Sequence, residues 1–164
     1  MKFDPKNEPT DEGKIEDFEA RKGVSLPVDY KTFLLEHNGG RPTENSAFAE
    51  VDWNGLVVED LFGLTDDTGH SIDRNWFNNF SDYIFARLLP VGFASASSLY
   101  MDLREGSMHG KIYILARPAN ETVLVDDAGF EDDGDYDEAK FLHPVANSWS
   151  EFIAMLGPAP QLGE

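Results

Sequence analysis

The sequence predicts a single α+β domain in which helices pack on one face of a mostly antiparallel β-sheet. Three observations support this prediction. The chain has 164 residues, which suits one domain, and 41% of them are hydrophobic, which is enough for a core. Both ends carry apolar residues at helical spacing, whereas the middle carries short alternating or β-branched runs. We expect a flexible arm at residues 1–10, the domain at 11–157 and a tail at 158–164.

Two helices are expected before residue 41. In the first, "GKIEDFEARKG" at 13–23 places Ile15 and Phe18 on one side, and Gly23 closes it. In the second, Pro27 suits the first helical position, and the charge of Asp29 meets the positive end of the helix dipole. Asn38-Gly39-Gly40 tolerates positive φ and ends this helix. Its predicted core face consists of Leu26, Tyr30, Phe33, Leu34 and His37.

The middle of the chain predicts strands joined by short turns, with Asn54-Gly55 as a hairpin signal. The strand-like runs are "FAEVDW" (48–53), "LVVEDLFGL" (56–64), "LLPVGFA" (88–94), "SLYMDL" (98–103), "KIYILARP" (111–118) and "TVLVDD" (122–127). Residues 71–85 predict a further helix with Ser71 as its N-cap, and residues 147–157 predict a closing helix. Between them, His143 and Pro144 suggest a turn.

The charge of the chain indicates which partners it favours. There are 31 acidic and 13 basic residues, for a formal net charge of −18, so binding to nucleic acid or an anionic membrane is not expected. This charge favours a basic protein partner, and it also keeps a protein in solution. The chain has no cysteine, no apolar N-terminal leader and no apolar run near the roughly 20 residues of a membrane span, so we expect a cytoplasmic protein.

The densest local feature is an acidic run at residues 126–138, with a smaller acidic loop at 64–71. A calcium loop is not predicted, because placing Gly134 at its sixth position would put Gly129, which has no side-chain oxygen, at the first. Two interpretations remain: a solvated loop, or a surface that mimics phosphate and steers a basic partner. Aromatic residues in the run would anchor such an interface. The candidate partner-binding residues are Asp66, Asp67, Asp126, Asp127, Phe130, Glu131, Asp132, Asp133, Asp135, Tyr136, Asp137 and Glu138.

No catalytic or metal-binding pattern emerges from the sequence. The histidines His37, His70, His109 and His143 stand in unrelated contexts without a metal-ligand spacing. The serines of "ASASS" at 94–98 lack the surrounding glycines of a nucleophile elbow. We therefore predict a protein that is not an enzyme and has no catalytic residues, no metal and no cofactor.

Three segments together resemble a known family. They are "IEDFEARKGVSLPVDYKTFLLEHNGG" (15–40), "LLPVGFASASSLYMDL" (88–103) followed by "GKIYILARP" (110–118), and "VANSWSEFIAMLG" (145–157). They resemble the SUKH superfamily, which includes cell-wall synthesis regulators of the Smi/Knr type. The first segment carries most of the resemblance, with its short helix, Leu-Pro, aspartate-aromatic pair, apolar helix and Asn-Gly-Gly in that order. The middle segment departs from the family pattern, since "GFASASS" replaces a Gly-Asp or Gly-Asn step.

The resemblance implies a non-catalytic protein-binding module. In bacteria such domains typically serve as immunity proteins that bind and neutralise a toxin domain, often a nuclease. The alternative is a regulatory or scaffold module of the cell-wall regulator type. The resemblance transfers no site residue. We expect a basic toxin domain as the partner and a monomer or weak dimer as the oligomeric state.

Overall fold

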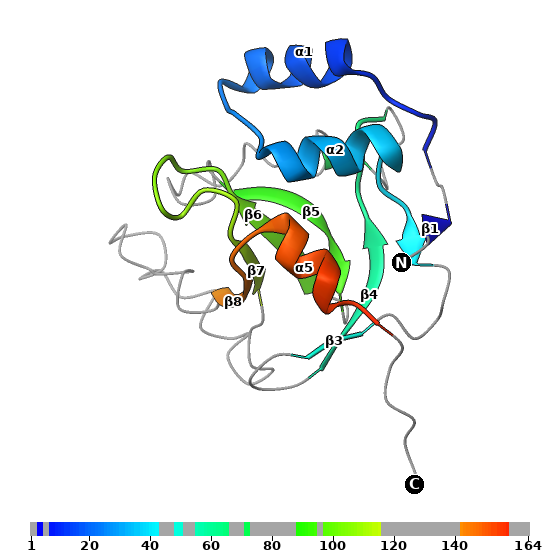
Figure 1. The fold of residues 1–164 in the computed structure, drawn as a ribbon, viewed down its shortest axis with the longest axis vertical. Helices are drawn as coiled ribbons and strands as arrows, with labels where there is room; N and C mark the ends of the chain where they lie inside the picture. Colours follow the sequence, from blue (N-terminus) through cyan, green and yellow to red (C-terminus); the bar gives the residue numbers. More distant parts are fainter. Residues whose placement is uncertain are drawn as a thin grey trace, which may run out of the picture.

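The computed structural model describes residues 3–4, 7–42, 48–50, 55–65, 71–72, 88–94, 97–115 and 142–157. In these residues six strands form one antiparallel sheet in the order of the chain, and two short strands form a second sheet (Figure 1). The predicted α+β class is therefore confirmed. The strands are β1 (Phe3–Asp4), β2 (Arg41–Pro42), β3 (Phe48–Glu50), β4 (Gly55–Leu61), β5 (Leu88–Ala94), β6 (Ser97–Asp102), β7 (Ile112–Leu115) and β8 (Leu142–Ala146). The helices are α1 (Glu12–Lys22), α2 (Val28–Glu36) and α5 (Trp149–Met155).

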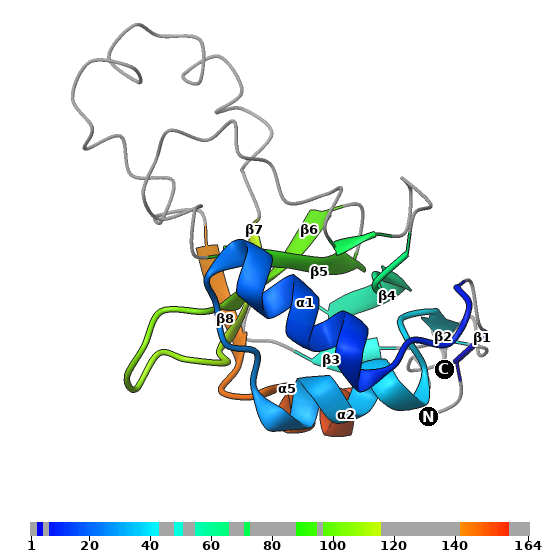
Figure 2. The same ribbon diagram turned by 90° about the horizontal axis from the view of Figure 1, so that it is seen from above.

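Helices α2 and α5 cover one face of the six-stranded sheet, and α1 lies beside α2 (Figures 1 and 2). Helix α5 contacts α2 and both edge strands, β3 and β8. Trp149 lies at the centre of this layer, with its ring centroid 4.7 Å from that of Tyr30 and 4.9 Å from that of Phe33. All three helices contribute side chains to one core, which also takes residues from β4 to β8.

The first two helices form as their sequence predicts. Helix α1 ends at Gly23, whose φ of 66° is left-handed, and it begins after Asp11, whose carboxylate accepts a hydrogen bond from Lys14 N. In α2, Tyr30, Phe33 and Leu34 are buried as expected. Pro27 departs from expectation by one position. Its ψ of 147° is extended, so it is the N-cap residue and the helix begins at Val28.

The strand prediction is confirmed for β3 to β7 and was wrong for β8. His143 and Pro144, expected in a turn, lie inside this strand, where Pro144 pairs with Tyr113 and His143 with Ile114. A proline is tolerated here because β8 is an edge strand and pairs with β7 alone. The missing N–H of Pro144 therefore does not deprive a second neighbouring strand of a hydrogen bond. The strand expected at 122–127 lies outside the described residues, as does the helix expected at 71–85 apart from Ser71 and Ile72.

The segment before α1 runs along the domain. In β1, Phe3 pairs with Pro42 and Asp4 with Arg41. The Asn7 side-chain amide then donates a hydrogen bond of 2.9 Å to Asn38 O. The domain limits stay a prediction. Within the described residues, no helix is long and apolar enough to cross a membrane.

Candidate functional site

The partner-binding residues predicted from the sequence are not placed by the structure. Asp66 and Asp67 of the smaller loop, and every residue of the acidic run at 126–138, lie outside the described residues. They stay a prediction.

Two of the sequence segments that carry the family resemblance contact each other directly. Asp29 Oδ2, at the start of α2, accepts a hydrogen bond of 2.8 Å from Ser150 N, at the start of α5. Their neighbours in the sequence continue the contact, since the rings of Tyr30, which follows Asp29, and Trp149, which precedes Ser150, meet edge to face. Ser148 Oγ accepts from Glu151 N at 3.0 Å and completes the cap of α5. These contacts therefore join two helices. Tyr30 and Trp149 are buried between them, whereas Ser150 and Glu151 lie at the exposed start of α5.

Asn38 is the second structural centre of the family segment. Its φ of 49° ends α2, and its buried side chain donates to Glu8 O (2.7 Å) and Leu64 O (2.9 Å) and accepts from Leu64 N (2.8 Å). The glycines around it allow backbones to approach closely. A Cβ on Gly39 would lie 2.6 Å from Leu61 O, and a Cβ on Gly63 would lie 2.1 Å from Asn38 O. The Asn-Gly-Gly step thus does more than end a helix: it fastens α2 to β4 and to the N-terminal segment.

The described histidines do not form a catalytic or metal centre. His37 lies beside Phe3 and Phe33, with ring centroids 5.1 and 5.3 Å away. His109 Nε2 lies 2.7 Å from Ser25 O and links the β6–β7 connection to the loop before α2. His143 belongs to β8, and His70 lies outside the described residues. Among the described residues, no three His, Asp or Glu side chains come together as metal ligands would.

A buried carboxylate at the end of β6 is held by an adjacent arginine. Asp102 is fully buried, and its Oδ2 accepts a hydrogen bond of 2.7 Å from Arg104 Nη2. The Asp102 Oδ1 accepts from Arg104 N at 2.9 Å and from Arg104 Nε at 3.1 Å. Burial, and then the Asp102 charge, raise the pKa of the nearby Tyr113 hydroxyl. The ion pair between Asp102 and Arg104 therefore holds the start of the connection between β6 and β7.

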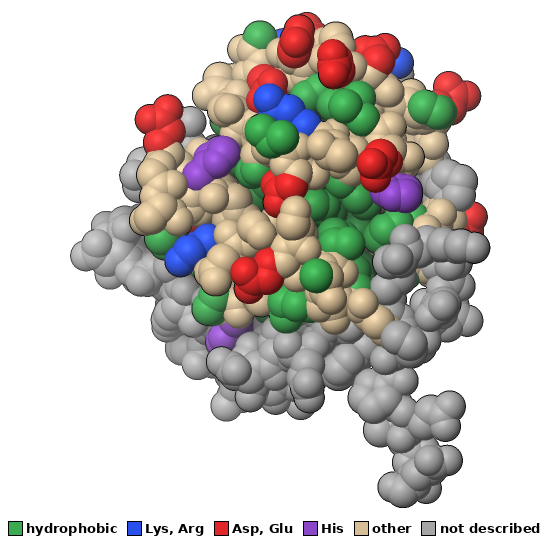
Figure 3. Space-filling view, viewed as in Figure 1, with side chains coloured by type: hydrophobic (Ala, Val, Ile, Leu, Met, Phe, Trp, Pro, Cys, Tyr) green, Lys and Arg blue, Asp and Glu red, His purple; other side chains and the backbone are tan. Residues whose placement is uncertain are grey.

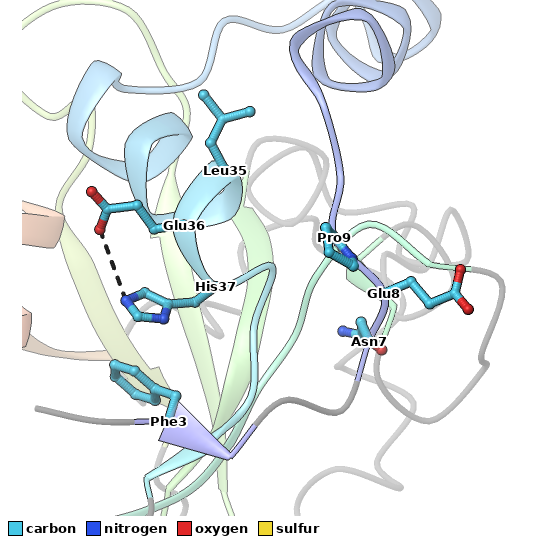
Figure 4. Close-up of a pocket in the computed structure, with 7 residues that line it drawn as sticks. All are labelled: Phe3, Asn7, Glu8, Pro9, Leu35, Glu36 and His37. Atoms are coloured by element: carbon cyan, nitrogen blue, oxygen red, sulfur yellow. Dashed lines mark ion pairs between the residues drawn. The ribbon is translucent and has the colours of Figure 1, made fainter.

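The outer side of α2 borders two hollows that meet at Leu35. The larger, of about 600 Å³, is lined by Phe3, Asn7, Glu8, Pro9, Leu35, Glu36 and His37 (Figure 4). Glu36 and His37 face each other across 3.8 Å, and the Glu8 carboxylate points away from them. The second hollow, of about 340 Å³, lies between α1 and α2. It is lined by Glu12, Ile15, Glu16, Glu19, Val28, Lys31, Thr32 and Leu35.

The hollow between α1 and α2 has an apolar floor and an acidic rim. Its floor includes two exposed hydrophobic side chains: Val28 is 78% exposed and Leu35 is 38% exposed. Figure 3 shows hydrophobic side chains between carboxylates on the face that carries the helices. We define the α1–α2 groove as the lining of the smaller hollow. Sequence reasoning missed it, although Val28, Thr32 and Leu35 recur at i, i+4 and i+7 on the polar side of α2.

The comparison with protein families matches residues 9–155, most of the chain, to the SMI1/KNR4 family (SUKH-1). The chain belongs to this family. The match confirms the resemblance seen in the sequence. The comparison with curated proteins found no match. In this SUKH-1 domain, the motif residues Asp29, Tyr30, Asn38 and Trp149 all make internal contacts.

Proposed function

We propose that this SUKH-1 protein is a non-catalytic binding module that acts as an immunity protein and neutralises a basic toxin domain. The observation that carries the proposal is the use of the family's motif residues. Asp29, Tyr30, Asn38 and Trp149 hold the helices and the sheet together. Because these residues make internal contacts, we assign the function to the exposed surface of the domain, which would act by binding a partner protein.

The charge of the chain supports a basic partner. A net charge of −18 produces a field that attracts a positively charged protein and speeds its encounter with this one. A nuclease toxin binds the phosphates of its substrate through lysine and arginine. An acidic protein that covers those residues therefore prevents the substrate from binding. Neutralisation by occlusion requires no reaction. The proposal includes action in the cytoplasm by a monomer or weak dimer.

Co-expression tests the immunity role. The C-terminal domain that the adjacent upstream gene encodes is tested as the toxin: it is produced with and without this protein, and growth is scored. The complex is then captured at low and at high salt. Rescue of growth together with a captured complex supports immunity by direct binding. A complex that weakens at high salt supports a contribution from the acidic surface, because salt screens exposed charges.

The opposite results would count against the proposal. Toxicity that persists with this protein present, and without a captured complex, would overturn the immunity role for that partner. Rescue without a complex would overturn occlusion. A binding partner from the native cytoplasm with no toxic activity would favour the regulatory or scaffold role.

A further inference from the structure

We propose that the α1–α2 groove is a docking site for an amphipathic helix of the partner that presents apolar residues flanked by lysine or arginine. The inference rests on the proposed function only in assuming that the partner is a protein. It places the contact on described residues of the helical layer, whereas the sequence had pointed to the acidic loops.

The two helices form the walls of the groove. Helices α1 and α2 follow each other in the chain through a short connection and lie side by side in both views (Figures 1 and 2). An ion pair of 3.1 Å between Lys31 Nζ and Glu19 Oε2 spans them, and the same Glu19 oxygen accepts from Leu26 N at 2.8 Å. Glu19 therefore ties α1 to α2 and to the connection between them, and the groove is present without a partner.

The floor of the groove offers an apolar stripe of helical length. Val28 and Leu35 are seven residues apart on α2, which corresponds to about 10 Å along the helix axis. Both side chains are exposed, while Ile15 of α1 closes the floor beneath them and is buried in the core. Two turns of a partner helix present residues at i, i+3, i+4 and i+7, the spacing that such a stripe accepts. Because Leu35 also lines the larger hollow, the site continues toward His37.

The rim of the groove selects the charge of the partner. Glu12 and Glu16 of α1 line it, and within the described residues neither carboxylate forms an ion pair or a side-chain hydrogen bond. The single cation of the groove lining, Lys31, is paired with Glu19. The rim therefore carries negative charge that is not neutralised, and it complements lysine or arginine beside the apolar face of a docked helix.

A synthetic peptide tests the groove directly. The probe is a hydrocarbon-stapled helix with leucines along one face and lysines beside them, labelled for fluorescence anisotropy. We expect it to bind the wild-type protein and to bind the Val28→Asn, Leu35→Asn double variant about tenfold more weakly, because the apolar contact is lost. The Glu12→Gln, Glu16→Gln double variant should bind several-fold more weakly at low salt, and this difference should disappear at high salt.

Matched variants elsewhere separate the groove from the overall charge. The single variant Leu35→Asn is measured as well, and Val57→Asn is its apolar control, because Val57 on β4 is 40% exposed and Leu35 is 38% exposed. Glu151, in the first turn of α5, matches Glu12, in the first turn of α1. Glu105 is exposed in the connection between β6 and β7, away from the groove lining, so the charge control is Glu105→Gln with Glu151→Gln. Circular dichroism confirms that each variant is folded. The controls should bind the peptide as the wild type does.

Three results would overturn the docking site. They are no binding of the stapled peptide, equal binding of a peptide with the same composition and no apolar face, and equal weakening by the control variants. The toxin rescue described above reports the immunity role separately. Rescue without peptide binding would overturn the groove and leave immunity in place, whereas peptide binding without rescue would do the reverse.

Discussion

The Asp29 carboxylate joins the starts of two helices: its Oδ1 accepts a hydrogen bond from Tyr30 N at 2.9 Å, and its Oδ2 accepts one from Ser150 N at 2.8 Å. The second bond connects residues 121 positions apart in the chain. One side chain therefore satisfies a backbone donor in the first turn of α2 and another in the first turn of α5. It also fixes where Trp149 meets Tyr30 and Phe33 in the core.

Replacing Asp29 with alanine should lower the free energy of unfolding by about 1–2 kcal/mol, since both helices lose a cap bond. The measurement is urea denaturation. Asp17→Ala is the control, because Asp17 pairs with Arg21 on the exposed side of α1 and a surface pair contributes less than about 1 kcal/mol. Equal losses in the two variants would show that the Asp29 bonds do not stabilise the domain.

Glycine at position 39 is required by space as well as by backbone conformation. Gly39 and Gly106 both have positive φ, of 87° and 100°, but a Cβ on Gly39 would meet Leu61 O at 2.6 Å, whereas nothing lies within 4 Å of one on Gly106. Gly106→Ala should therefore destabilise by about 1–2 kcal/mol from backbone strain alone. We expect a clearly larger loss for Gly39→Ala in the same denaturation experiment. A loss no larger than that of Gly106→Ala would contradict the close approach of α2 and β4.

Removing Arg104 should expose the dependence of Asp102 on its partner. Asp102 is fully buried, so Arg104→Gln leaves a buried carboxylate without its cation and should destabilise by about 3 kcal/mol. Arg21→Gln, which breaks an exposed pair with Asp17, should change stability by less than about 1 kcal/mol. The double variant Asp102→Asn, Arg104→Gln should recover part of the loss, because the unpaired charge is gone. No recovery would mean that the charge of Asp102 is not what makes Arg104 necessary.

Tyr30 should control stability in alkaline solution. Burial raises the pKa of its hydroxyl well above the ordinary value of 10, and within the described residues this oxygen has no hydrogen-bond partner. Above about pH 10 the unfolded chain loses this proton while the folded chain keeps it, so stability falls as pH rises, by about 1.4 kcal/mol per pH unit for one proton. Tyr30→Phe should remove this part of the decline and leave stability at pH 7 unchanged or up to about 1 kcal/mol higher.

Denaturation of wild type and Tyr30→Phe at neutral and at alkaline pH checks this expectation. Tyr113→Phe is the comparison, because the pKa of Tyr113 is also raised but its side chain is partly exposed. Parallel alkaline declines for wild type and Tyr30→Phe would show that Tyr30 is not the responsible group.

Local patterns in the sequence predict most of the described fold. Apolar residues at helical spacing place α1 and α2, and glycine and asparagine mark their ends. Strand β8 was missed because Pro144 suggests a turn, and only the position of this strand at the sheet edge makes the proline acceptable. The role of Asp29 was seen only in part. Its charge suits the start of its own helix, but no local pattern shows that Ser150 lies beside it.

The candidate site was harder to predict than the fold. Helical spacing places Leu34 on the core face and leaves Leu35 off it, as the structure has them, but it does not show that Leu35 borders a hollow. The groove arises from two helices, so a pattern within one helix does not reveal its acidic rim. The acidic residues that do stand out in sequence, at 126–138, lie outside the described residues and stay a prediction.

The order of strands in the sheet has a consequence for how the chain folds. From β3 to β8, each strand pairs with the next described strand along the chain. The contact between Asp29 and Ser150 closes a loop of 121 residues, which carries a larger entropic penalty than a hairpin. We therefore expect α5 to dock late in folding. During synthesis, we expect the core around Tyr30 to stay open until α5 has emerged from the ribosome, and a chain that stops before Trp149 would leave that apolar surface uncovered.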